Sequence, residues 1–324
     1  MALLVGIDEA GYGPLLGPLV VSAVALKVPE GLLRADLWEV LAKAVSAQKR
    51  GLAGRLLIAD SKKAYNRKKG IDPLRRSVLA GVHAWKNGDT QTETVADVLS
   101  LICPQLLERV NLYPWYQALD AHGLGHDAAD VSIAGGVLEK TMAEHGIAIS
   151  SIQSRCLDVA FYNDRVGKVK NKSRVLFTEL CSLIGQAFEQ NAAGAKPMQV
   201  IVDRQGGRTH YLRELQRMFP AASLSVVRED EKISSYELSR SGRIMRIHFC
   251  IKADTKYLTV ALASMVSKYL REVMMESLNR HFCQLCPELK PTAGYWQDGQ
   301  RFMKDLSKAL EADQFDTDKL VRIL

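Results

Sequence analysis

The sequence predicts an α/β fold, in which a central β-sheet is flanked by helices and interrupted by a mainly helical insertion. Short apolar runs rich in β-branched residues, such as residues 18–26 (PLVVSAVAL), alternate with longer runs whose apolar positions recur at helical spacing, such as residues 172–192. With 324 residues, of which 47% are hydrophobic, the chain is long enough to bury a sizeable core.

The predicted elements follow one another along the chain. Residues 2–7 and 18–26 are expected to form the two strands of a hairpin, because both are apolar and a glycine-rich turn separates them. Further strands are expected at residues 55–60, 148–161, 198–202, 224–228 and 244–251. Helices are expected at residues 32–47, 72–86, 172–192 and 259–280.

The charge balance and the cysteine pattern limit which kinds of protein the sequence can encode. The chain carries 43 Lys and Arg against 36 Asp and Glu, a formal net charge of +7, which suits a polyanionic partner such as nucleic acid. An ordinary solvated surface can carry the same excess, so this signal leaves both interpretations open. Six scattered cysteines with a single CxxC pair favour a reduced, cytoplasmic chain over a zinc cluster. The N-terminal apolar stretch is broken by Asp8 and Glu9, so neither a signal peptide nor a membrane partner is expected.

Acidic residues stand at the ends of three predicted strands. LLVGIDE runs into Asp8 and Glu9, QVIVD ends at Asp203, and HFCIKAD ends at Asp254 before a long predicted helix. Strand ends of an α/β sheet converge at one edge, so we expect these four carboxylates to lie together. A lone aspartate after a strand is more often a helix cap or a turn residue, but capping does not easily explain two adjacent acids.

Four gathered carboxylates would repel one another unless cations lay among them. Carboxylate oxygens suit Mg²⁺ or Mn²⁺, and two such ions about 4 Å apart can stabilise both the attacking and the leaving oxygen of a phosphodiester displacement. The residues taken by themselves leave a metal site and a set of ordinary turn residues as open alternatives.

Five sequence blocks, in matching order, resemble those of the ribonuclease HII family. They read GIDEAGYGPLLGPLVVSAV, DSKK (Asp60 to Lys63), IVDRQGG, KADTKYLTVALASMVSKYLREVM and TAGY before WQDGQRFMKDL. The first and fourth blocks are specific, whereas the second and fifth are weak alone and gain weight from their order. Residues 87–150 have no counterpart in this resemblance.

The resemblance implies an RNase H-like fold with a mixed central β-sheet flanked by helices. It also implies a metal-dependent endoribonuclease that cleaves the RNA strand of RNA–DNA hybrids, with DNA containing ribonucleotides as a further candidate substrate, and leaves 5′-phosphate and 3′-hydroxyl ends. The catalytic and metal-binding roles carry over onto Asp8, Glu9, Asp203 and Asp254, which would hold two Mg²⁺ or Mn²⁺ ions.

With this resemblance in place, we expect three regions. Residues 1–86 and 151–280 would form a discontinuous RNase H-like catalytic domain. Residues 87–150, whose helix-like runs are broken by NLYPWY and AHGLGHDAAD, would form an inserted helical subdomain. Residues 281–324 would form a C-terminal helical segment that completes the substrate cleft.

Substrate recognition in the family resembles a scheme of backbone contacts. Glycines of a GRG turn let peptide groups approach the ribose 2′-hydroxyl, and a GY tyrosine stacks on the next sugar. These roles carry over onto Gly11, Gly13 and Tyr295. Tyr12 stands where the family has arginine, which predicts weaker recognition of a single ribonucleotide in DNA, while a packing role for Tyr12 is the alternative.

The basic segment after the DSKK aspartate offers further substrate contacts. Ser61, Lys62 and Lys63, together with Lys68 and Lys69, are expected to face phosphates, because the segment follows a strand that should end at the same edge of the sheet. An exposed basic loop is the alternative interpretation.

Two rival functions remain. One is a nucleic-acid-binding protein with altered catalysis on an RNase H scaffold; retention of four mutually repelling acids argues against it. The other is a metal-dependent nuclease of the same fold that acts on DNA or branched structures. The paired glycines and Tyr295, which the resemblance links to ribose recognition, argue against that one.

Overall fold

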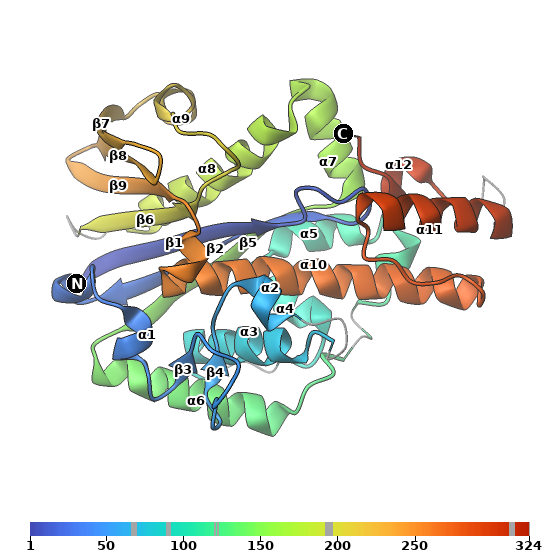
Figure 1. The fold of residues 1–324 in the computed structure, drawn as a ribbon, viewed down its shortest axis with the longest axis horizontal. Helices are drawn as coiled ribbons and strands as arrows, with labels where there is room; N and C mark the ends of the chain where they lie inside the picture. Colours follow the sequence, from blue (N-terminus) through green and yellow to red (C-terminus); the bar gives the residue numbers. More distant parts are fainter. Residues whose placement is uncertain are drawn as a thin grey trace.

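A seven-stranded mixed sheet forms the centre of the computed structural model, which describes residues 1–65, 70–88, 92–119, 121, 123–191, 197–310 and 315–323. The strands lie in the order β5-β2-β1-β6-β9-β8-β7 (Figure 1). β1 pairs antiparallel with β2 and parallel with β6, which in turn pairs parallel with β9, so the mixed α/β sheet predicted from the sequence is confirmed. The bounds are β1 Ala2–Ala10, β2 Leu19–Val28, β5 Ala148–Leu157, β6 Met198–Asp203, β7 Ser223–Glu229, β8 Ile233–Arg240 and β9 Arg243–Cys250.

Helices cover both faces of the sheet (Figure 1). One face carries the 28-residue helix α10 (Leu258–Leu285), together with α3 (Asp72–Trp85), α4 (Val95–Ile102), α5 (Pro104–Val110) and α6 (Ala128–Glu144). The other face carries α7 (Val159–Val169) and α8 (Lys172–Gln190), and α9 (Leu212–Met218) packs beside β7. The C-terminal part forms α11 (Trp296–Ala309) and α12 (Thr317–Leu320), and the short elements are α1 (Leu37–Val40), α2 (Ser61–Ala64) and the 3₁₀ turns η1 (Glu30–Leu32), η2 (Pro114–Tyr116) and η3 (Ala253–Thr255).

Alternation along the strands divides the apolar residues between two cores. Leu4 and Val24 face the core shared with α10, whereas Val5 and Ile7 face the core shared with α8. Side chains of α4, α5 and α6, including Leu99, belong to the same core as α10. The helices of residues 87–150 therefore pack directly onto the main sheet layer, and their assignment to a separate subdomain stays a prediction.

Helix α10 approaches β1 through backbone contact at Gly6. A Cβ atom at Gly6 would lie 2.2 Å from the carbonyl carbon of Thr259 and 2.3 Å from the nitrogen of Val260. Only glycine allows this approach, because a real Cβ cannot come so close to backbone atoms. The first turn of α10 therefore contacts β1 at Gly6, two residues before Asp8.

Several predicted elements differ from the observed ones. The helix expected at residues 32–47 is wrong: this segment forms η1, α1 and a short strand β3 (Val45–Ser46). β3 pairs with β4 (Leu56–Leu57), and the N–H of Leu56 donates to Ala44 O at 2.8 Å. The strand expected at residues 55–60 is thus shorter than predicted, because only Leu56 and Leu57 form it. This tertiary pairing takes backbone groups that a helix would have used. The prediction also missed β8 and α7.

None of the helices within the described residues is long and apolar enough to cross a membrane.

Candidate active site

The four predicted acids lie at the same edge of the sheet. Asp8 and Glu9 are among the last residues of β1, rather than beyond its end as predicted. The neighbouring parallel strand β6 ends at Asp203, in register with Cys250 at the end of β9. Asp254 follows in η3, just after β9. Three adjacent parallel strands thus deliver their C-terminal ends, and the acids on them, to one place.

Asp8 and Glu9 sit in surroundings that disfavour their charge. Burial, reinforced by the charges of Glu9 and Asp203, raises the pKa of Asp8 well above its ordinary value. Burial and the charge of Asp203 raise the pKa of Glu9 to about 7. Such shifts arise when carboxylates share a poorly solvated place, and a bound cation would relieve them.

Asp203 and Asp254 show the same effect on a smaller scale. Burial raises the pKa of Asp203 to about 6, with a further contribution from the charge of Asp254. Burial and the charge of Asp60 raise the pKa of Asp254. Lys62 opposes these increases, because its ammonium lowers the pKa of Glu9 and of both aspartates. Asp60, which had no predicted role at the site, is therefore its electrostatic neighbour.

A buried set of serines supports Asp8 from α10. Ser267 Oγ lies 3.0 Å from the backbone oxygen of Asp8 and 2.8 Å from Ser22 Oγ. Ser264, one turn earlier on α10, hydrogen-bonds to the Asp8 carboxylate, and its Oγ lies 3.1 Å from Ser61 Oγ. These bonds connect β1, β2 and α2 to the same helix. They fix the position of Asp8 without supplying any opposing charge.

The chemistry of this donor set fits a hard divalent cation. It consists of carboxylate oxygens alone, and each of the four carboxyl groups has a pKa raised by burial and like charge. In the part of the chain that the structure describes, no group of three or more His, Cys, Asp or Glu side chains is close enough to hold a metal ion. A Mg²⁺ site that keeps several waters needs fewer protein ligands than a closed one, so the fit rests on donor type and charge.

The turn after β1 differs in crowding at its two glycines. Gly11 has φ +88°, and a Cβ there would lie 2.5 Å from Pro18 O and 2.8 Å from Arg271 side-chain atoms. Gly13 has no atom within 4 Å of a Cβ position, so its surface is open. Tyr12 between them is half-buried and packs against the core on the α8 side. Of the two glycines, only Gly13 therefore has open space beside its backbone.

The C-terminal GY block packs directly against this turn. Gly294 O accepts hydrogen bonds from the N–H groups of Leu15 (2.8 Å) and Leu16 (3.0 Å). Tyr295 next to it remains 49% exposed. The guanidinium of Arg271 lies 5.6 Å from the centre of the Tyr295 ring and donates to Ala293 O at 2.9 Å. The tyrosine is thus anchored to the turn while its ring stays accessible.

Two further residues of α10 hold this arrangement in place. Glu272 Oε1 pairs with Lys268 Nζ at 2.6 Å and with Arg271 Nη1 at 3.1 Å. Arg271 is only 1% exposed, so its charge depends on this carboxylate.

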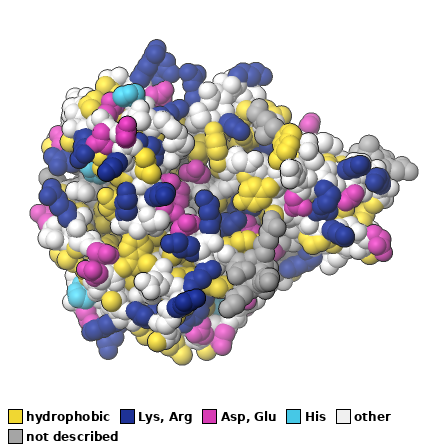
Figure 2. All heavy atoms as spheres, viewed as in Figure 1, with side chains coloured by type: hydrophobic (Ala, Val, Ile, Leu, Met, Phe, Trp, Pro, Cys, Tyr) yellow, Lys and Arg dark blue, Asp and Glu magenta, His cyan; other side chains and the backbone are white. Residues whose placement is uncertain are grey.

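The basic segment is split between the site and the surface. Ser61 is buried at the start of α2, and the Asp60 carboxylate caps that helix by accepting from Lys62 N at 2.9 Å. Lys62 and Lys63 are exposed. Lys68 and Lys69 lie outside the described residues. Figure 2 shows Lys and Arg side chains spread over this face of the molecule, with a group of acidic side chains near its centre.

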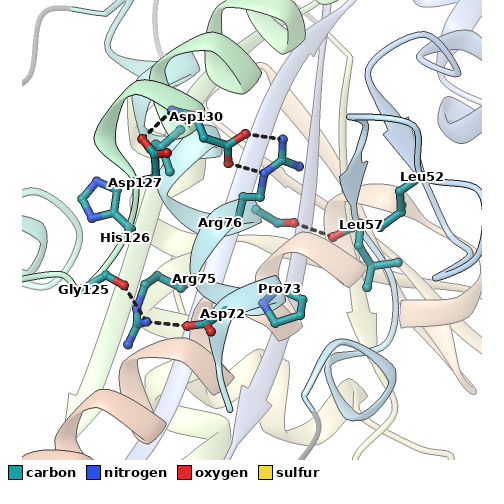
Figure 3. A pocket seen from close by; sticks show the side chains of 12 residues that line it. Leu52, Leu57, Asp72, Pro73, Arg75, Arg76, Gly125, His126, Asp127 and Asp130 are labelled. Atoms are coloured by element: carbon teal, nitrogen blue, oxygen red, sulfur yellow. Dashed lines mark hydrogen bonds and ion pairs between the residues drawn. The ribbon is translucent and has the colours of Figure 1, made fainter. Parts of the chain in front are cut away.

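A cavity away from the four acids carries no sign of a second site. It has a volume of about 490 Å³ and is formed by α3, the start of α6 and neighbouring loops, with no predicted site residue in its wall (Figure 3). Its charged groups are mutually paired: Arg76 binds Asp130 through two bonds of 2.6 and 3.0 Å, and Arg75 binds Asp72 at 2.7 Å. This pairing leaves little unmet charge for a ligand.

Comparison with known proteins identifies relatives of part of the chain. Residues 222–301 match the family model described as Ribonuclease HII; this segment contains Asp254 and Tyr295. A Ribonuclease HII of Gluconobacter oxydans is 47% identical over 58 residues, which cover 18% of this chain and 28% of that protein. A Ribonuclease HII of Brucella ovis is 37% identical over 89 residues, covering 24% and 39%. The chain thus spans less than half the length of these curated relatives.

A solved structure supports the same fold over the whole chain. Bst-RNase HIII in complex with Mn²⁺ superposes with a TM-score of 0.50 at 16% identity, covering 99% of this chain and 66% of that one. The predicted RNase H-like fold is thereby confirmed.

Proposed function

From the match of residues 222–301 to the Ribonuclease HII family model and the similarity to curated Ribonuclease HII proteins, we propose that this chain is a metal-dependent endoribonuclease of that family, which cleaves the RNA strand of RNA–DNA hybrids. One observation carries the proposal: three parallel strand ends bring Asp8, Glu9, Asp203 and Asp254 to one edge of the sheet, where burial and like charge raise all four pKa values.

These four carboxylates would hold two Mg²⁺ or Mn²⁺ ions. Bound there, the ions would activate the attacking water and stabilise charge on the leaving oxygen of the phosphodiester. The chain itself positions the ligands: α10 holds the backbone of Asp8 through Ser267, and the N–H of Ala253 holds Asp203 Oδ1 at 2.7 Å. In the absence of metal, Lys62 partly offsets the carboxylate charge.

The surroundings of the acids supply a basis for choosing RNA. The open backbone at Gly13 allows close approach of a ribose, whose 2′-hydroxyl distinguishes RNA from DNA. The exposed ring of Tyr295, anchored beside the same turn, offers a stacking surface. Ser61, Lys62 and Lys63 begin the basic segment, and Lys62 is close enough to Glu9, Asp203 and Asp254 to lower their pKa values. Ribonucleotides embedded in DNA are a second proposed substrate, for which Tyr12 in place of an arginine predicts lower efficiency.

Three end-labelled duplexes test this function: an RNA–DNA hybrid, DNA with one ribonucleotide, and plain DNA, each with Mg²⁺, with Mn²⁺ or with EDTA. We expect cleavage of the hybrid with either ion, none with EDTA, and products with 5′-phosphate and 3′-hydroxyl ends. Asp8→Asn should abolish cleavage, while Glu144→Gln, a change at an exposed acid on α6 that pairs with Lys43, should not. Cutting of plain DNA would instead indicate a DNA nuclease, and no cutting of any duplex would refute the proposal.

A further inference from the structure

Two cations without an ion-pair partner among the described residues lie beside the Tyr12 turn. Lys172 is the first residue of α8, and its Nζ lies 5.3 Å from the centre of the Tyr12 ring. Arg208 follows β6 through a short turn in which its N–H donates to Gln205 O at 3.3 Å. The Nη2 of Arg208 lies 3.4 Å from the hydroxyl of Ser173, the residue after Lys172. The start of α8, the 205–208 turn and the Tyr12 turn therefore meet.

An aromatic platform holds the Arg208 guanidinium in place. Its central carbon lies 5.6 Å from the ring centres of both Phe177 and Tyr211. Tyr211 itself stacks on Phe249 with 3.7 Å between ring centres and an angle of 4°. Because these rings belong to the buried core on the α8 side, the guanidinium is ordered before any ligand arrives.

Polar groups at this place lack partners. Arg208 Nη1 and both side-chain amide atoms of Gln205 are buried and make no hydrogen bond to the described residues. Buried polar groups in folded proteins are nearly always paired, so unpaired ones mark a place where a water, ion or ligand binds. A free guanidinium donor, a free amide and an ammonium group together suit an anion. The N-terminus of the 19-residue helix α8 adds positive potential in the same direction.

We propose that Lys172, Gln205 and Arg208 form a subsite for a phosphate group of the nucleic-acid backbone. The inference rests on the proposed function and adds residues that the sequence resemblance did not assign. Tyr12 is three residues after Glu9 and Arg208 is five residues after Asp203. The subsite would hold a neighbouring phosphate of a strand whose cleaved phosphate meets the acids. Such a contact carries no sequence information and serves to hold the strand in register.

Binding without cleavage tests the subsite. The anisotropy of a fluorescent RNA–DNA hybrid is titrated with protein in EDTA, over a series of KCl concentrations, and a plain DNA duplex is titrated in parallel. We expect Arg208→Gln to bind the hybrid about tenfold more weakly and Lys172→Gln several-fold more weakly. Each change should reduce the slope of log Kd against log [KCl] by the amount expected for the loss of about one phosphate contact. Both duplexes should be affected alike.

Arg246→Gln is the matched control. Arg246 is half-exposed on β9, four residues before the strand end that carries the site, and pairs with Glu237 at 3.1 Å. Its substitution should leave both affinity and salt dependence unchanged. Thermal unfolding checks that each variant folds; if the aromatic platform needs Arg208, Arg208→Lys and Lys172→Gln still carry the test.

The outcomes separate the two proposals. If Arg208 and Lys172 variants bind like Arg246→Gln while the unaltered chain cleaves the hybrid, the subsite is wrong and the proposed function stands. If the unaltered chain neither binds nor cleaves the hybrid, both are wrong. A weakening confined to the hybrid, with plain DNA unaffected, would also overturn a backbone-phosphate contact, because both duplexes carry that phosphate.

Discussion

The carboxylate of Asp203 accepts a hydrogen bond from the backbone N–H of Ala253, with 2.7 Å between Oδ1 and N. Ala253 directly precedes Asp254, so this bond ties the third acid of the site to the turn that carries the fourth. Only Oδ1 is engaged by this bond, which leaves Oδ2 to bind a cation. Asp203 therefore has two separable roles, as a hydrogen-bond acceptor and as a charge.

Asp203→Asn and Asp203→Ala distinguish these roles. Both should lower hybrid cleavage more than about a hundredfold, since even residues behind metal ligands cost about 10–100-fold. Asn can still accept from Ala253, and it removes a charge that the fold disfavours. Its free energy of unfolding in EDTA at pH 8 should therefore exceed that of Ala by about 1 kcal/mol. Urea denaturation measures this difference, and equal stability of the two variants would contradict the acceptor role.

The stability of the metal-free chain should fall as pH rises toward neutrality. The pKa of Glu9 is about 7 in the folded chain, against an ordinary value of 4.5, so between these values the folded state binds more protons than the unfolded state. The contribution of Glu9 is fully present below pH 4.5 and is lost as pH passes 7. Asp203 acts in the same direction between 3.8 and about 6.

Urea unfolding in EDTA at pH 5, 6, 7 and 8 measures this effect. Glu9→Gln should flatten the decline between pH 6 and 7, because the amide does not titrate. Addition of Mg²⁺ should stabilise the unaltered chain most at pH 8, where the carboxylates are charged. An unchanged decline in Glu9→Gln would show that the pKa of Glu9 is not raised.

Gly11→Ala should destabilise the fold by about 2 kcal/mol. Alanine is strained at φ +88°, and its Cβ would meet Pro18 O at 2.5 Å. Gly13→Ala is the control within the same turn, because its Cβ meets nothing; its stability should change by less than about 0.5 kcal/mol. Thermal unfolding compares the two. A similar loss in both variants would mean that the crowding at Gly11 does not determine the turn.

Glu272→Ala should cost about 3–5 kcal/mol, because it leaves the buried guanidinium of Arg271 without its carboxylate. Glu276→Ala, one turn later on α10, removes a half-exposed carboxylate 3.7 Å from Arg75 and should cost less than about 1 kcal/mol. Chemical denaturation of both variants provides the comparison. If Glu272→Ala unfolds no more readily than Glu276→Ala, the ion pair does not support the Tyr295 block.

Local sequence patterns predicted the elements that carry the acids, but not all their neighbours. Strand periodicity and the acid at each strand end were enough to bring Asp8, Asp203 and Asp254 to one edge, because parallel strands leave little choice of geometry. The helix expected at 32–47 failed, because the pairing of β3 with β4 depends on residues distant in sequence. The contact between Lys172 and Tyr12 could not be predicted for the same reason: it joins a turn to a helix about 160 residues later.

The backbone contact at Gly6 limits how the site can adjust. At Gly6 the backbones of α10 and β1 are in direct contact, so no side chains lie between them that could rearrange. Asp8 lies two residues beyond the contact on the strand, and Asp254 lies five residues before Thr259 on the chain that enters the helix. The backbone contact between β1 and α10 therefore determines the distance between these two acids. Adaptation to a metal ion or a substrate falls to side-chain rotation and to Lys62, and the frame that carries the acids stays rigid.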